Sequence, residues 1–128
     1  MDRRLIAAFL ALAAASPTAA QPGAVHKTTL QQVPFPGPVY DSVMVRTVVD
    51  RGGVVARHTH PGLELAYVQS GLALVRIQGR PDRRMPSGSS FAVPEKTPHE
   101  VRNVGPGPLT IVSTYVVDRS QPIASPAP

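Results

Sequence analysis

The chain has 128 residues, a formal net charge of +5, and neither cysteine nor tryptophan. This length suits one domain, and the lack of cysteine excludes disulfides, thiolate metal sites and cysteine nucleophiles. The basic residues are scattered along the chain without interleaved aromatic residues, so nucleic-acid binding is not expected.

The first 20 residues have the pattern of a secretory signal peptide. A charged start, Met1–Arg4, precedes the uninterrupted apolar run Leu5–Ala15, and small residues at Thr18–Ala20 suit cleavage after Ala20. The run is shorter than the roughly 20 residues that a membrane-spanning helix needs. We therefore expect an exported protein, periplasmic or secreted, without a membrane span after cleavage. The Arg3-Arg4 pair leaves a twin-arginine export signal open beside the general secretory route, and a retained anchor or a helix of the fold are the alternatives.

The rest of the chain has the pattern of short strands broken by glycine and proline. Residues 21–38 form a Pro-rich arm with one or two edge strands, residues 39–119 form the domain, and residues 120–128 form a Pro-rich tail that we expect to be frayed. The 15 prolines argue against a helical protein, and many short strands predict an all-β sandwich or barrel. Runs rich in β-branched and aliphatic residues predict the strands Val43–Val49, Val54–His58, Leu63–Gln69, Leu72–Gln78, Ser90–Val93 and Leu109–Val117.

A histidine pair lies at the end of one predicted strand. His58 and His60 are two residues apart, so their side chains share a face at a separation of about 7 Å. Two imidazoles so placed can converge on one ion, although an isolated pair is weak evidence because surface histidines are common. Glu64 lies in the otherwise apolar run Leu63–Val68, where a carboxylate is costly unless it is paired or bound to a metal. His99 would have to join this set from a distant strand.

Two spacings around these residues resemble the conserved motifs of the cupin superfamily. The first is Gly52-x5-His58-x-His60-x3-Glu64-x6-Gly71, and the second is Gly88-x5-Pro94-x4-His99-x3-Asn103. One position departs from the family pattern, because Lys96 stands in the turn before His99, where a glycine is frequent. The short stretch between the two motifs is typical of small microbial cupins with a single domain.

The resemblance implies an all-β fold, a small cupin β-barrel or double-stranded jelly roll whose ligands point into the interior. It also implies that His58, His60, Glu64 and His99 bind one divalent transition metal ion. Ligand softness alone does not choose between Fe, Mn, Ni, Co, Cu and Zn. Small cupins often pair through their sheets, and the Val-rich strands of this chain would permit a homodimer.

The alternation of side chains along the strands predicts which residues line the expected pocket. Ala66 and Val68 share the phase of Glu64, and Phe91, which alternates in the same way, is expected in the core or at the pocket. Asn103 has two open interpretations, a pocket position or a hydrogen bond at a turn or strand end.

Three functions follow from such a site, whose open metal positions would accept a small organic molecule. They are a dioxygenase-like reaction, a metal-dependent isomerase or lyase reaction in which the ion acts as a Lewis acid, and binding of a metal or ligand without turnover. A proton-abstracting lyase or isomerase needs a further acid or base in the pocket. No carboxylate besides Glu64 has the inward phase, since Glu100 should point away from His99. Among the enzymatic functions the sequence therefore slightly favours oxygen-dependent chemistry, and it identifies no catalytic residue.

Overall fold

The computed structural model describes residues 23–128, so the predicted signal peptide of residues 1–20 lies outside the described part. The described residues contain no helix, and hence none long and apolar enough to cross a membrane. They form the strands β1 (Val25–Val33), β2 (Tyr40–Val49), β3 (Val54–Thr59), β4 (Gly62–Ser70), β5 (Leu72–Ile77), β6 (Arg83–Pro86), β7 (Ser90–Val93), β8 (His99–Asn103), β9 (Leu109–Asp118) and β10 (Ser125–Pro126).

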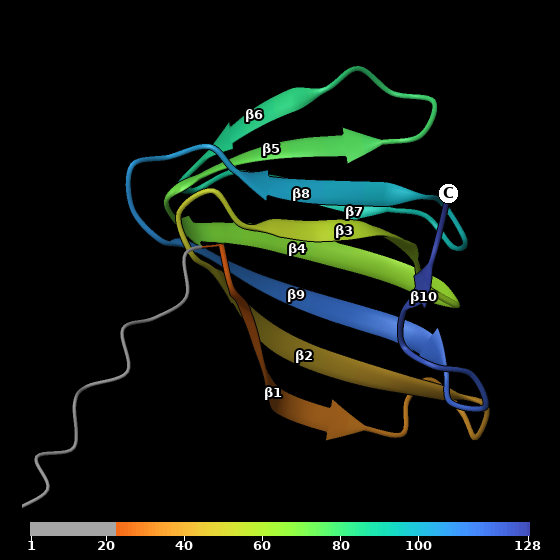
Figure 1. Cartoon of the computed structure of the whole chain (residues 1–128). Coiled ribbons are helices and arrows are strands. Elements are labelled where there is room, and N and C mark those ends of the chain that lie inside the picture. The colour runs from red at the N-terminus through yellow and green to blue at the C-terminus, as the bar shows by residue number, and fades with distance from the viewer. Residues whose placement is uncertain (1–22) are drawn as a thin grey trace, which may run out of the picture.

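The strands build two antiparallel sheets that pack face to face. The first sheet has the order β1-β2-β9-β4-β7 and the second has the order β10-β3-β8-β5-β6. The edge strands β1 and β6 lie at opposite sides of the molecule (Figure 1). This arrangement confirms the predicted all-β jelly roll.

The core follows from the period of two that a strand imposes on its side chains. In β9, buried residues alternate strictly with partly exposed ones along the whole strand. Alternate residues of β4 and β5 are buried in the same way. Inward residues of both sheets form the larger apolar cluster, which includes Val49, Val68, Val75, Val101 and Leu109, and inward residues of β2 and β9 form a second one of Val43, Val45, Tyr115 and Val117.

Within residues 39–119, two strands lie outside the runs that the sequence analysis identified. Strand β6 falls in a stretch rich in charge and glycine, and only its Met85 is buried. Strand β8 buries His99, Val101 and Asn103, so polar residues occupy two of its three inward positions. A hydrophobicity pattern does not detect a strand whose inward face is mostly polar.

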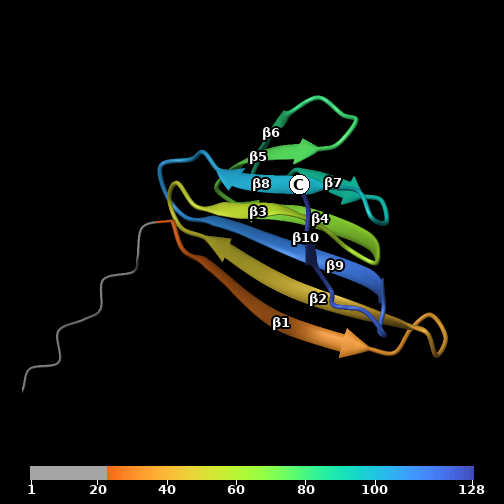
Figure 2. The ribbon, with the colours of Figure 1, turned by 45° about the vertical axis from the view of Figure 1, so that its right-hand side comes forward.

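The two flanks of the domain are both part of the fold. Strand β1 pairs along β2, as the expected edge strand of the N-terminal arm. The expectation of a frayed tail is wrong for its last residues, because Ser125 and Pro126 pair with β3 and the N–H of Ala127 donates to the carbonyl of Arg57. Figure 2 shows the dark blue segment running from the end of β9 to the edge of the second sheet. The tail is held by backbone hydrogen bonds rather than by apolar side chains, so its amino-acid composition did not indicate that it is ordered. Its prolines are tolerated because proline can lie on an edge strand.

The outward face of β4 is apolar. Leu63, Leu65 and Tyr67 are 39%, 50% and 49% exposed. Such a face is compatible with pairing through the sheets, and the homodimer stays a prediction.

A close backbone approach fixes the start of β4. A Cβ added to Gly62 would lie 1.9 Å from the carbonyl oxygen of Val116 and 2.8 Å from the Cα of Val117. Both atoms belong to the backbone of β9, so no side chain can move aside to make room. Only glycine allows β4 to pair with β9 directly after the His58/His60 pair.

We expect Gly62→Ala to lower the free energy of unfolding by more than about 2 kcal/mol, because the two strands must separate locally. Gly107→Ala is the matched control, since a Cβ there meets nothing within 4 Å. Urea denaturation of both variants measures the difference. Equal stability of the two would contradict the close approach.

Candidate metal centre

A β-bulge in β3 aims His58 into the interior. Val55 pairs with Val101 and His58 pairs with His99, so β3 has one residue more than β8 between these two pairs. Without the bulge, alternation from the inward Val55 would turn His58 to the outside. The same register places His58 and His99 directly opposite each other on neighbouring strands.

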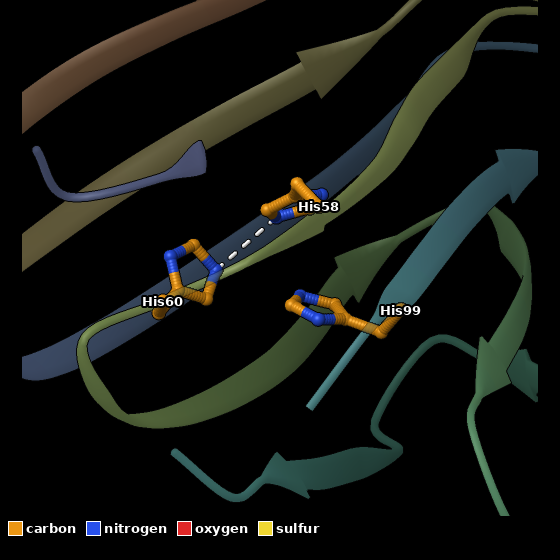
Figure 3. Close-up of side chains that lie close together, drawn as sticks. All are labelled: His58, His60 and His99. Atoms are coloured by element: carbon orange, nitrogen blue, oxygen red, sulfur yellow. Dashed lines mark hydrogen bonds between the residues drawn. The ribbon is translucent and has the colours of Figure 1, made fainter. Parts of the chain in front are cut away.

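Three imidazole rings converge at this point. His58, His60 and His99 are each at most 9% exposed, and one ring nitrogen of each lies within 4.8 Å of those of the other two. The Nε2 atoms of His58 and His60 are 3.1 Å apart. Figure 3 shows the rings facing one another: His58 comes from β3, His60 follows the last residue of β3, and His99 comes from β8.

The other nitrogen of each ring faces a backbone carbonyl. His58 Nδ1 lies 2.7 Å from the carbonyl oxygen of Ala56, and His99 Nδ1 lies 3.0 Å from that of Thr97. His60 Nδ1 contacts the carbonyl oxygen of Ile123, in the C-terminal segment. A carbonyl only accepts, so each Nδ1 carries the hydrogen and each neutral ring directs its Nε2 lone pair at the cluster. This arrangement orients imidazoles for metal binding.

Glu64 brings a carboxylate to the same place. Its Oε2 lies 3.0 Å from His99 Nε2 and 3.2 Å from His60 Nε2, and its Oε1 accepts a hydrogen bond of 2.8 Å from the Ser113 hydroxyl. Glu64 Oε2 and His99 Nε2 are both buried without a hydrogen-bond partner. Lone pairs so close together repel unless a cation lies between them, and that cation is either a proton on Nε2 or a metal ion. The donor set of three imidazoles and one carboxylate therefore fits a transition metal ion.

The environment of the site shifts the pKa values of Glu64 and His58. Burial by itself would raise the pKa of Glu64, but when protons rather than a metal ion occupy Nε2 of His60 and His99, the hydrogen bonds and positive charges of these rings outweigh burial and hold this pKa well below its usual range. Burial, together with the charge of His99, lowers the pKa of His58 to about 4. The His58 imidazole thus stays neutral, the form that binds metal, into acidic solution.

A cavity of about 20 Å³ adjoins the cluster, enough for roughly one water molecule. Its lining includes His58, Glu64 and His99 of the predicted site, and also Phe91. Ala66 and Val68, expected as pocket wall, do not line this cavity but pack in the apolar core between the sheets.

Asn103 lies away from the cavity and has a structural task. Its Nδ2 donates to the carbonyls of Val49 and Gly107, and its Oδ1 accepts from the N–H of Gly105. The structure therefore supports the second interpretation of Asn103, a hydrogen bond at a strand end, and not a pocket position. These bonds tie the loop after β8 to the end of β2.

Lys96, where the cupin motif frequently has a glycine, lies in the turn before His99. Its φ is 53°, the left-handed region that glycine adopts without strain, and its N–H donates to the carbonyl of His60. The turn thus couples the two histidine motifs, and a glycine would adopt the same backbone more easily.

Two site residues were missed by the sequence analysis. Ser113 and Tyr115 lie on β9 and are both buried; Tyr115 pairs directly with Glu64 across the strands, and its ring centroid lies 4.6 Å from that of His60. Burial raises the pKa of Tyr115, and the negative charge of Glu64 raises it further. The sequence did contain a signal for them: Ser113 and Tyr115 occupy inward positions of β9, and a side-chain hydroxyl is unusual among the apolar residues at the other inward positions.

The remaining histidine of the chain and Glu100 lie away from the cluster. His26 is an exposed residue of β1, with its Nε2 3.5 Å from Asp50 Oδ2. Glu100 points away from His99 and lies 3.2 Å from Arg76 and 3.6 Å from Arg102.

Comparisons with known proteins agree with this architecture. The sequence model of the family described as "Cupin domain" matches residues 45–115, whereas no curated protein matches the chain. Among solved structures, an uncharacterized conserved protein with a double-stranded β-helix domain from Klebsiella pneumoniae is similar with a TM-score of 0.70 and 21% identity, over 86% of this chain and 90% of that one.

Two solved enzymes are also similar. DMSP lyase DddQ from Ruegeria pomeroyi has a TM-score of 0.68 and 19% identity, over 80% of this chain and 51% of that one. A recombinant oxalate oxidase in complex with glycolate has a TM-score of 0.66 and 25% identity, over 83% of this chain and 56% of that one. The chain thus spans about half the length of each enzyme, and the likeness to the lyase shows the fold alone.

The metal-free protein should lose stability as the pH falls from about 6.5 to 4. The pKa of His58 is about 4 in the folded state against 6.5 for an ordinary histidine, so the unfolded chain binds more protons in this window. The lowered pKa of Glu64 extends the loss below about 4.5. Urea unfolding at a series of pH values, after chelation of metal, measures the effect. His58→Gln should flatten the upper part of the curve, and a flat wild-type curve between pH 6.5 and 4.5 would refute the assignment.

Proposed function

Because the chain belongs to the cupin family, we propose that it holds one divalent transition metal ion through His58, His60, His99 and Glu64 and uses it to act on a small organic molecule. The observation that supports this proposal is the pair of buried, unpartnered atoms Glu64 Oε2 and His99 Nε2, 3.0 Å apart. When bound, the ion would polarise an oxygen of the ligand or lower the pKa of a bound water.

Room for a small molecule lies outside the inner cavity. A cavity of about 310 Å³ is lined by His58 together with residues of β1, β3 and the C-terminal segment. A second cavity of about 210 Å³ is lined by His60, Tyr115 and the same segment. Both volumes are close to the lower end of the range for small-molecule sites, so a compact ligand suits them.

Tyr115 favours proton-transfer chemistry without a change of metal oxidation state, as in a lyase or isomerase. The preference for an oxygen-dependent reaction rested on the lack of a further acid or base in the pocket, and Tyr115 supplies such a group. Its raised pKa keeps the phenol protonated, so its role is to donate a hydrogen bond to an oxygen of the substrate, and a proton only where that oxygen becomes strongly basic, as in an alkoxide or enolate. Glu64, as a metal ligand, is not free for this task.

A dioxygenase-like reaction is the second candidate. The mixed donor set suits redox-active iron, manganese, copper or nickel as well as zinc. The similarity to an oxalate oxidase supports this candidate, and binding without turnover is the third.

Metal analysis of the purified protein tests the ligand assignment. We expect about one equivalent of metal in the wild type and loss of most of it in His60→Ala, because the remaining donors no longer surround the ion. His26→Ala removes an exposed histidine outside the site and should keep full occupancy. Unchanged stoichiometry in His60→Ala would refute the assignment.

The two reactions differ in their need for oxygen. Protein loaded in turn with Zn²⁺, Fe²⁺, Mn²⁺ and Ni²⁺ should be assayed with flavonol, enol and small carboxylic acid substrates, with and without oxygen. Proton-transfer chemistry predicts turnover in the absence of oxygen and a loss of about 100-fold in kcat for Tyr115→Phe at unchanged metal content. Oxygen uptake equal to product formation would support the dioxygenase instead.

A further inference from the structure

A lysine from the N-terminal arm lies at the entrance to the site. Lys27 is on β1, where it pairs with Thr47 of β2, and residues paired in this way point to the same face of a sheet. Thr47 is 5% exposed and lines the inner cavity. Lys27 lines the inner cavity and both outer cavities.

The C-terminal segment forms the opposite side of this entrance. Ala124 lines both outer cavities together with Lys27, so these cavities lie between β1 and the segment that ends in β10. A ligand held at Lys27 would have His58 on one side and His60 on the other, since each histidine lines one of the outer cavities.

The ammonium group of Lys27 has no acidic partner among residues 23–128: neither an ion pair nor a side-chain hydrogen bond involves it. Glu64 is the one described carboxylate in the lining of the three cavities, and it faces His60 and His99. The nearby cation Arg57 is already engaged by the backbone oxygen of Pro128 and by Gln78. Lys27 is thus an exposed positive charge at a largely apolar entrance, free to pair with the anionic group of a ligand that enters the cavities.

We infer that Lys27 binds the anionic group, in its simplest form a carboxylate, of a small substrate whose other end reaches the metal centre. This inference rests on the proposed function, because the metal ion supplies the second attachment point. It assigns a class of ligand, a small organic acid, to the site. Lys27 acts in it as a specificity-determining residue.

The test compares dicarboxylates with their monoamides, which keep nearly the same size and shape but carry one negative charge less. Malonate, succinate and glutarate, and the monoamide of each, are titrated into the Co²⁺-loaded full chain by calorimetry, with the visible spectrum of Co²⁺ as a second readout. We expect at least one dicarboxylate to bind about tenfold more tightly than its monoamide, as a charge-assisted hydrogen bond would give. In Lys27→Gln this ratio should fall below about twofold, and Lys27→Arg should restore most of it.

Arg46→Gln is the matched control, because it removes the same charge from an exposed position next to Thr47 in sequence and hence on the other face of β2. It should leave the preference and the Co²⁺ content unchanged. An equal loss of preference in both variants, or a ratio near one for all three pairs in the wild type, would overturn the inference. Failure of Co²⁺ to bind the wild type would instead contradict the proposed function, and the same titrations of the metal-free protein would still decide whether Lys27 selects the dianion.

Discussion

A buried carboxylate that faces imidazole nitrogens is the constraint on which this structure depends. Glu64 Oε2 lies within 3.2 Å of two Nε2 atoms, and carbonyls behind the rings fix the opposite nitrogens as donors. Bare lone pairs at this distance repel in a low-dielectric interior, so the site is stable only with a cation inside it. Protons and a metal ion compete for that role, and stability, pH and metal occupancy are therefore linked.

The sheets supply the rigidity that this constraint demands. The bulge in β3 turns His58 inward, the register of β8 places His99 beside it, and the close approach at Gly62 lets β4 carry Glu64 to the same point. Each side chain is thus placed by backbone pairing with a neighbouring strand. A site built on strands holds its ligands with little freedom to relax, which suits an ion that needs fixed donors.

In the proposed function, the flanks of the chain make the candidate metal site selective. The C-terminal segment reaches the site through the contact of Ile123 with His60, and β1 brings Lys27 to the entrance. Tyr115 adds an acid that is protonated over the physiological range. Together these groups support the proposal of a compact site for an anionic molecule with an oxygen that accepts a hydrogen bond.

The sequence by itself determined the all-β class and most of the strands, and it selected His58, His60, Glu64 and His99 as candidate metal ligands, because strand alternation and motif spacing are local properties. It did not reveal the bulge in β3, Tyr115 beside Glu64 or the ordered tail. Those features depend on which strand lies next to which, and pairing is set by backbone hydrogen bonds between segments far apart in the chain. Only the tertiary structure therefore decided that Lys27, from an arm without chemical signal, lies at the entrance to the histidines.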